Sequence, residues 1–227
     1  MSVFTDFLKL WRAEDMLSQA WEESYEMLNL SREIFFQALK MLREKSNRAT
    51  VKALKKRDKE INAYQQNVRR KVMTHYAVKQ ETFDIESGMV LVNMVVDIER
   101  VGDYTKNILD LAINHPETII AEDISEDLHI IETELRSRFD KTLEAIHTQD
   151  PEVAQSLLDT YTDQVTSLSD GIVNGILAGK LTFGSEAKTA AVALYARYLK
   201  RIGAHLKNIT TTLINPFDTI GYKPKTS

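Results

Sequence analysis

The sequence RVGDYTKNI at residues 100–108 occurs a second time, in the related form RIGAHLKNI, at residues 201–209. Five of the nine positions are identical under this shift of 101 residues. Both stretches lie in segments whose apolar residues recur at helical spacing. Each segment continues to an Ile-Asn pair, at 113–114 and at 214–215, shortly before a proline that ends helices. The repeat therefore indicates an internal duplication of a helical unit.

Apolar periodicity on both sides of this repeat predicts six long helices, three in each half, and so an all-α fold of two three-helix units. The six expected segments are residues 13–44, a second that includes 54–72, a third that follows 79–82 and ends at 114, then 128–146, 150–179 and 185–215. Three signals mark ends: the N-cap sequence at Asp150-Pro151, the cap Ser185 and the terminator Gly179.

These segments divide the chain into a first repeat at residues 1–118, a second repeat at residues 119–216 and a disordered tail at residues 217–227. Composition agrees with helices, since 8 Gly and 4 Pro in 227 residues are too few for a sandwich, a barrel or a Gly-rich phosphate loop. The absence of Cys excludes disulfides and thiolate sites, and favours the reducing cytoplasm. Neither a signal peptide nor a membrane span is expected, because charged or polar residues interrupt each apolar run.

The predicted third helix carries two unusual stripes. Met89, Val92 and Val96 lie opposite its main apolar seam, so we expect its first half to be covered on both sides. The same face continues with oxygen-bearing side chains one turn apart, namely Glu99, Asp103, Asn107 and Asp110. Like charges at this spacing repel, and partial burial increases the cost, so a cation should balance them.

The sequence alone allows two sources of that cation. One is an internal ion pair with Lys106, Arg100 or the lysines of the second helix. The other is a hard metal ion, held by carboxylates and completed by a neighbouring helix. Pairs with the same spacing occur at Asp58 and Asn62 in the second helix and at Asp159 and Asp163 in the fifth.

The sequence DIERVGDYTKNI at residues 97–108 resembles the signature of the PhoU family of phosphate-transport regulators, Asp-Leu-Glu-Arg-Ile-Gly-Asp-His-Ala-x-Asn-Ile, which occurs in each of two repeats. The resemblance covers essentially the whole chain. It implies two pseudo-symmetric three-helix bundles, bound metal, and repression of the phosphate-starvation response through a phosphate transporter and a sensor histidine kinase.

By the same resemblance Glu99 and Asp103 match the metal-binding pair, for Fe, Zn or Mg. The second repeat departs from the signature, because Lys200 and Ala204 stand at the two carboxylate positions. Asn62 stands where the second helix of the family usually has Asp. We therefore expect a second site without metal, and a divergent member that serves another phosphate transporter.

A di-metal carboxylate enzyme of the ferritin type is the enzymatic alternative. Such a protein needs Glu-x-x-His tetrads on two helices, and this chain has tetrads at Glu126 and Glu144. These lie on one predicted helix, about 27 Å apart at 1.5 Å per residue, so they cannot share a metal pair. The other histidines, at 75, 115 and 205, are expected at the surface or at helix ends. The sequence thus favours a protein that is not an enzyme.

Residues 40–71 hold twelve Lys or Arg against three acids, whereas the whole chain carries a net charge of −4. No nucleic-acid motif accompanies this basic segment, and the sequence pI is near 5.8. It is therefore predicted to be either a solvated helical end or a docking surface for an acidic partner or an anionic membrane. A homodimer is possible, because the small residues Gly171, Gly175 and Ala178 would let another helix approach closely.

Together these features predict a cytoplasmic regulator of phosphate uptake that acts through protein contacts and binds metal at Glu99 and Asp103. The competing hypothesis keeps the fold and removes the metal. The protein would then be a helical interaction module, accessory to another membrane transporter, in which protein cations neutralise the two carboxylates.

Overall fold

The computed structural model describes residues 16–44, 46–79, 85–115, 125–161 and 163–222, and every regular element in these ranges is a helix. The elements are α2 (Met16–Arg43), α3 (Arg48–Lys56), α4 (Asp58–Lys79), α5 (Ile85–Asn114), α6 (Ser125–Thr148), α7 (Pro151–Asp159), α8 (Gln164–Leu177), α9 (Glu186–Thr211) and the 3-10 turn η2 (Phe217–Thr219). The all-α prediction is confirmed.

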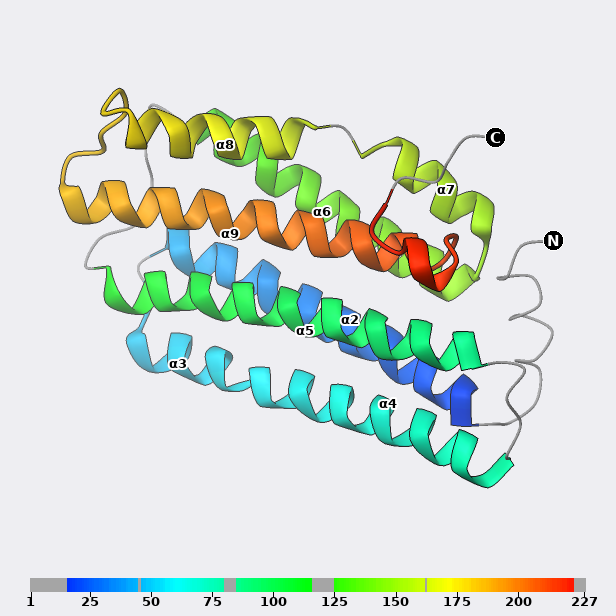
Figure 1. Ribbon diagram of the computed structural model, residues 1–227. Helices are drawn as coiled ribbons and strands as arrows, with labels where there is room; N and C mark the ends of the chain where they lie inside the picture. The colour runs from blue at the N-terminus through cyan, green and yellow to red at the C-terminus, as the bar shows by residue number, and fades with distance from the viewer. Residues whose placement is uncertain (1–15, 45, 80–84, 116–124, 162, 223–227) are drawn as a thin grey trace.

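The helices form two three-helix units that face each other (Figure 1). The first unit consists of α2, α3 with α4, and α5, and the second of α6, α7 with α8, and α9. The pieces α3 and α4 lie on one side of the molecule and α7 and α8 on the other, whereas α5 and α9 pack side by side between them. The third helix of each repeat therefore joins the halves.

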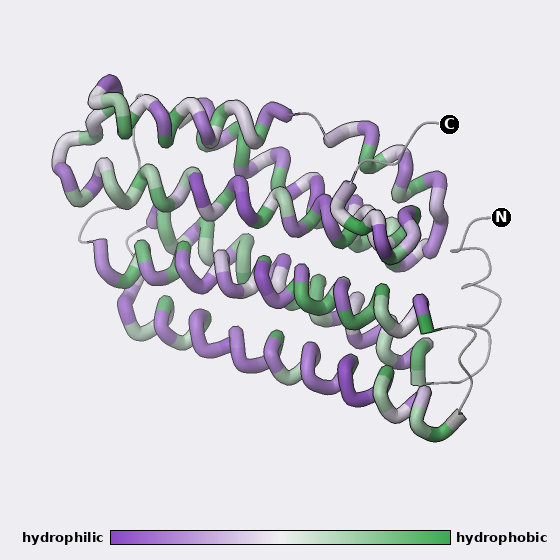
Figure 2. Tube along the Cα trace, in the orientation of Figure 1, coloured by the Kyte–Doolittle hydropathy of each residue, from purple (hydrophilic) through white to green (hydrophobic). Residues whose placement is uncertain are grey.

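Apolar side chains from both repeats form one continuous core. Figure 2 shows hydrophobic and hydrophilic residues alternating along the helices, which is the pattern of amphipathic helices with one buried face. The rings of Phe35 on α2 and Phe139 on α6 lie 5.2 Å apart between centroids. The indole nitrogen of Trp21 donates to the carbonyl of Ile146 at 3.3 Å. Because the halves share this core, we expect them to unfold together.

The second helix of each repeat is broken, whereas the sequence predicted continuous helices. The first break falls at Arg57, whose backbone N–H turns to the carbonyl of Leu54 at 3.0 Å, so that α4 restarts at Asp58. The second break separates α7 from α8, and the hydroxyl of Thr160 donates to the carbonyl of Leu157 at 2.7 Å. Side-chain and i–3 bonds of this kind replace the regular helical ladder.

The predicted caps are confirmed where the structure describes them. The side chain of Asp150 accepts from the N–H of Glu152 with Pro151 at the first helical position, and that of Ser185 accepts from Lys188. Gly179 has φ of +67°, a conformation that glycine adopts without strain after a helix end. The start expected near residue 13 and the boundary expected at residue 118 lie outside the described residues.

The C-terminal part of the chain differs from the prediction in two respects. The last helix ends at Thr211 and not at 215, and the backbone N–H groups of Leu213 and Ile214 then bond the carbonyls three residues back, both at 3.2 Å. Residues 217–222 of the expected disordered tail are ordered. The N–H of Phe217 donates to Glu86 at 3.0 Å, and the amide of Asn215 donates to the carbonyl of Tyr222 at 2.9 Å.

The second apolar face of α5 is only partly covered, which corrects the expectation that its first half is enclosed. Val72 and Tyr76 of α4 and Phe217 of η2 reach this face, but a cavity of about 320 Å³ stays open beside Val92. Met89 is accordingly 43% exposed. Within the described ranges, no helix combines the length and the apolar character needed to cross a membrane.

Candidate functional site

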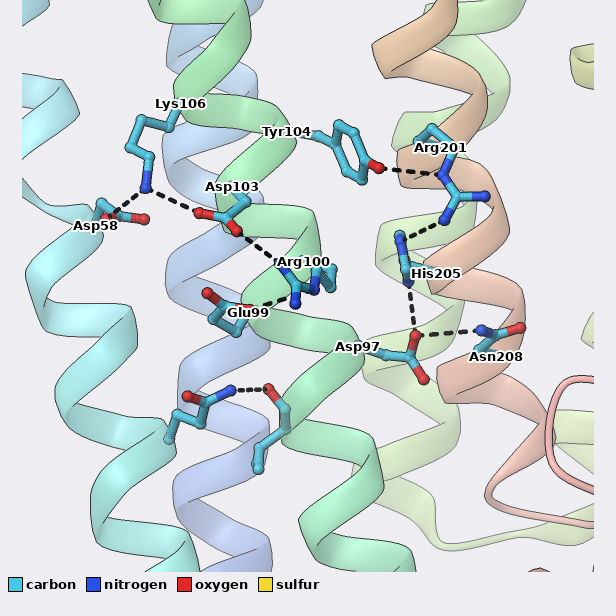
Figure 3. A network of polar contacts seen from close by, with 12 residues as sticks. Asp58, Asp97, Glu99, Arg100, Asp103, Tyr104, Lys106, Arg201, His205 and Asn208 are labelled. Atoms are coloured by element: carbon cyan, nitrogen blue, oxygen red, sulfur yellow. Dashed lines mark hydrogen bonds and ion pairs between the residues drawn. The ribbon is translucent and has the colours of Figure 1, made fainter. Parts of the chain in front are cut away.

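Three carboxylates gather where α4 faces α5. Glu99 and Asp103 lie one turn apart on α5, as their spacing predicted, and Asp58 comes from the first residue of α4 (Figure 3). The break at Arg57 gives Asp58 this place, because α4 begins directly after it. Their side chains are half-buried. Burial, followed by the charge of Asp103, raises the pKa of Glu99 above its ordinary value of 4.5.

A lysine from α5 bridges two members of the acidic cluster, which we define as Asp58, Glu99 and Asp103. The Nζ atom of Lys106 donates to Asp103 at 2.8 Å and to Asp58 at 3.0 Å (Figure 3). Partial burial alone would lower the pKa of Lys106, but the hydrogen bonds to Asp103 and Asp58 outweigh it and raise that pKa. The cluster therefore holds its own ammonium group.

An arginine completes the charge balance of the cluster. Arg100 donates to Asp103 at 3.2 Å and lies 3.8 Å from the nearest oxygen of Glu99. The amide of Asn62, the position where the family usually has Asp, donates to Asp58 at 3.3 Å. Every carboxylate of the cluster thus has a cationic neighbour supplied by the protein.

The arrangement of these side chains does not fit a metal ion. Asp58 and Asp103 both direct an oxygen at the ammonium of Lys106, and a hard cation needs those oxygens for itself. Over the described ranges, no group of three or more His, Cys, Asp or Glu side chains is placed to hold a metal. Metal binding by Glu99 and Asp103 stays a prediction.

The other members of the predicted stripe and the predicted tetrads lie elsewhere. Asp110 pairs with Lys55 of α3 and is separate from the acidic cluster. Asp159 ends α7 and Asp163 precedes α8, and both are exposed. The tetrads that begin at Glu126 and Glu144 both belong to α6, as predicted, and so cannot share a metal pair.

The second repeat has an ion pair at the corresponding place between its second and third helices. The Nζ atom of Lys200 on α9 donates to both oxygens of Asp170 on α8, at 2.7 and 2.6 Å. Ala204 is exposed and contributes no ligand. The sequence indicated the cation but missed Asp170, because the break between α7 and α8 changes which residue of the second helix faces α9.

A buried polar network between the repeats was also missed. His205 of α9 bonds Asp97 of α5 at 2.6 Å, and Asn208 donates to the same oxygen at 3.2 Å (Figure 3). On the other side of the ring, Arg201 lies 3.4 Å from Nε2 and donates to the hydroxyl of Tyr104 at 3.2 Å. Because a carboxylate only accepts, this pattern assigns the proton of His205 to Nδ1.

The structure corrects the prediction for two histidines. His205 and His75 are 8% and 3% exposed, so neither is a surface residue, whereas His115 does follow the end of α5. The signal for the network was present in the repeat itself. Tyr104 and His205 are equivalent under the shift of 101 residues, and their rings stack at 5.7 Å and 26°. Two equivalent residues that contact each other lie close to the axis that relates the two repeats, and Tyr104 and His205 are such a pair.

The raised pKa of Glu99 gives a first testable prediction. A folded pKa above the unfolded value means that ionisation opposes folding, so the stability of the wild type falls as pH rises through that interval. Glu99→Gln removes this effect. We expect the variant to melt above the wild type at pH 7 in EDTA, with the gain absent at pH 4.

The control for this experiment is Glu26→Gln, at an exposed position of α2. Thermal melts followed by circular dichroism at both pH values provide the measurement. A Glu99→Gln protein that melts below the wild type at pH 7 in EDTA would contradict the electrostatic account.

The fold and the paired networks define a class of protein, the duplicated three-helix bundle whose third helices pack together. A family model described as the PhoU domain matches residues 25–112 and 130–213, once in each repeat. The chain belongs to the PhoU domain family. A comparison with curated proteins gives no match.

Two solved structures share the fold at low sequence identity. The phosphate transport system regulatory protein PhoU from Streptococcus pneumoniae is 20% identical, with 87% of this chain and 92% of that chain covered and a TM-score of 0.71. PhoU from Pseudomonas aeruginosa is 18% identical, with 87% and 95% covered and a TM-score of 0.73. The predicted family resemblance and the bundle fold are both confirmed.

Proposed function

We propose that this protein regulates phosphate transport from the cytoplasmic side of the membrane by binding a component of a phosphate transporter. The match of the PhoU domain to both repeats is the observation that carries the proposal. A sensor histidine kinase is a second proposed partner. Action through contacts rather than catalysis agrees with the site, whose described acidic and basic side chains are engaged with one another.

The outer face of α3 and α4 supports a position at the membrane. Exposed positions recur there every three or four residues over both helices: Lys52, Lys56, Lys59, Ala63, Gln66, Arg70, Met73 and Ala77. Lys52, Lys56 and Lys59 make no ion pair with any residue that the structure describes. Met73 is 74% exposed one turn beyond Arg70. A basic row with an apolar tip suits the surface of an anionic bilayer.

Some of the other Lys and Arg side chains of residues 40–71 form ion pairs within the protein. Arg43 bonds Glu132 at 2.6 Å, Lys71 pairs with Glu23 at 3.2 Å, and Lys55 pairs with Asp110. These ion pairs engage three of the bases of the segment, so the proposal rests on the exposed row on α3 and α4. The proposal assigns this row to acidic lipid headgroups beside the transporter.

Charge reversal tests the membrane assignment. Each nearby Lys contributes about 1 kcal/mol to binding an anionic membrane, so Lys52→Glu/Lys56→Glu/Lys59→Glu is expected to weaken binding to phosphatidylglycerol vesicles at least about tenfold. The matched control is Lys141→Glu/Lys180→Glu/Arg197→Glu, which reverses three exposed bases of the second repeat. Vesicle sedimentation measures both. Equal binding by the first variant and the wild type, or an equal loss in the control, would refute the assignment.

Affinity purification from membranes of phosphate-replete cells tests the regulatory proposal itself. We expect the tagged wild-type chain to recover a phosphate-transporter component. Recovery of neither a transporter component nor a kinase would contradict the proposed function. The vesicle experiment would still test membrane binding independently.

A further inference from the structure

We propose that Lys106 and Lys200 take the charge-balancing place of a metal ion, one in each repeat, so that the protein keeps its helix packing without metal. This inference does not depend on the proposed partners. It concerns how the second and third helices of each repeat are held together, and it opposes the prediction of metal at Glu99 and Asp103 in a way that one experiment separates.

The first repeat shows the substitution within a full set of carboxylates. Lys106 reaches from α5 across to α4, where its Nζ atom lies 3.0 Å from Asp58 and 2.8 Å from Asp103. Glu99 lies one turn before Asp103 on α5, and its carboxylate is 3.8 Å from the guanidinium of Arg100 (Figure 3). An incoming cation would have to displace the ammonium before it could use these oxygens.

The second repeat reaches the same result from a different sequence position. Lys200 corresponds to Glu99 under the shift of 101 residues, whereas the counterpart of Lys106 is Lys207. Yet Lys200 bridges the second and third helices by bonding both oxygens of Asp170. Two lysines that are not equivalent therefore meet one shared requirement, a positive charge between those two helices.

The chemistry of the ligands explains why a lysine suffices. An ammonium group has three donors and is satisfied by two or three carboxylate oxygens, whereas Mg²⁺ or Ca²⁺ requires six or more oxygen ligands. With Lys106 removed, the first repeat still offers three carboxylates, with Arg100 beside Glu99 and Asp103 as their remaining cation. Among the described residues the second repeat offers Asp170 alone, because Ala204 has no oxygen in its side chain. The two repeats thus form a matched pair for an experiment.

The test compares Lys106→Met with Lys200→Met. We expect the wild type, purified without chelator, to contain at least about tenfold less metal than one equivalent per chain. EDTA should leave its melting temperature unchanged. Lys106→Met should bind Mn²⁺ or Zn²⁺ at least about tenfold more tightly than the wild type in calorimetric titration. Its melting temperature should then rise with metal and fall with EDTA. Lys200→Met should gain no such affinity.

Two further variants keep the outcome decisive. Glu99→Gln in the Lys106→Met background should abolish the gain, which assigns the new affinity to the acidic cluster. Lys106→Gln, with a polar side chain of similar length, replaces Lys106→Met if that protein fails to fold by circular dichroism. Stoichiometric metal in the wild type that is lost in Glu99→Gln/Asp103→Asn would overturn the proposal. Equal metal affinity of Lys106→Met and the wild type would also overturn it.

Discussion

Replacing Asp97 with alanine is expected to lower the free energy of unfolding by about 3 kcal/mol. The carboxylate is 7% exposed and accepts from both His205 and Asn208 across the contact between α5 and α9. Without it, the buried donor of His205 and the half-buried donor of Asn208 lose their acceptor, and the loss of an acceptor by a buried donor costs about 1–3 kcal/mol. Urea unfolding followed by circular dichroism measures the change.

A double-mutant cycle with His205→Ala checks that the loss belongs to this pair. The two substitutions should be non-additive by more than about 1 kcal/mol, because each removes the same hydrogen bond. Asp97→Asn keeps one acceptor oxygen and should lose less than Asp97→Ala. A loss below about 1 kcal/mol in Asp97→Ala, or strict additivity in the cycle, would show that the network does not hold the repeats together.

Valine at either glycine of the repeated motif is expected to lower the free energy of unfolding by about 2–3 kcal/mol. A Cβ atom added at Gly102 would lie 3.0 Å from Ile61 of α4, and one added at Gly203 would lie 3.1 Å from Leu135 of α6. The third helix of each repeat thus approaches its neighbour too closely for a branched side chain. Chemical denaturation gives the loss for each variant.

Gly171→Val is the matched control, since nothing lies within 4 Å of a Cβ atom at that position of α8. This control should be neutral or slightly stabilised, because glycine costs a helix interior about 1 kcal/mol relative to alanine. Equal losses at Gly102 and Gly171 would mean that helix propensity, and not close packing, explains the effect. The predicted role of Gly175 in a dimer is a separate matter: its neighbour is Leu181 of the same chain, and dimerisation stays a prediction.

The duplication and the helical segments could be predicted because their signals are local. Caps at Asp150 and Ser185 and the glycine at 179 mark ends that the chain itself determines. The breaks at Arg57 and before Gln164 carry no Gly or Pro. They arise from hydrogen bonds to backbone carbonyls and from packing against other helices, so periodicity in one segment cannot reveal them.

The candidate site was predictable only on one helix at a time. The spacing of Glu99 and Asp103 placed them on one face of α5, and Lys106 was already a possible partner within that helix. Asp58 and Asp170 enter from other helices, at registers that the breaks determine. The burial of His205 depends on which face of α9 meets α5, and that choice is made by the docking of the repeats.

The position of α5 has a consequence for how a binding event would spread through the molecule. One face of this helix holds Lys106 against Asp58, and another holds Asp97 against His205 of the opposite half. A partner that displaces α4 must also act on α5, and α5 is the helix that packs against α9. Amide hydrogens along α5 should accordingly exchange only when the whole chain opens, and slower exchange throughout α9 on addition of a ligand for α4 would reveal mechanical continuity between the halves.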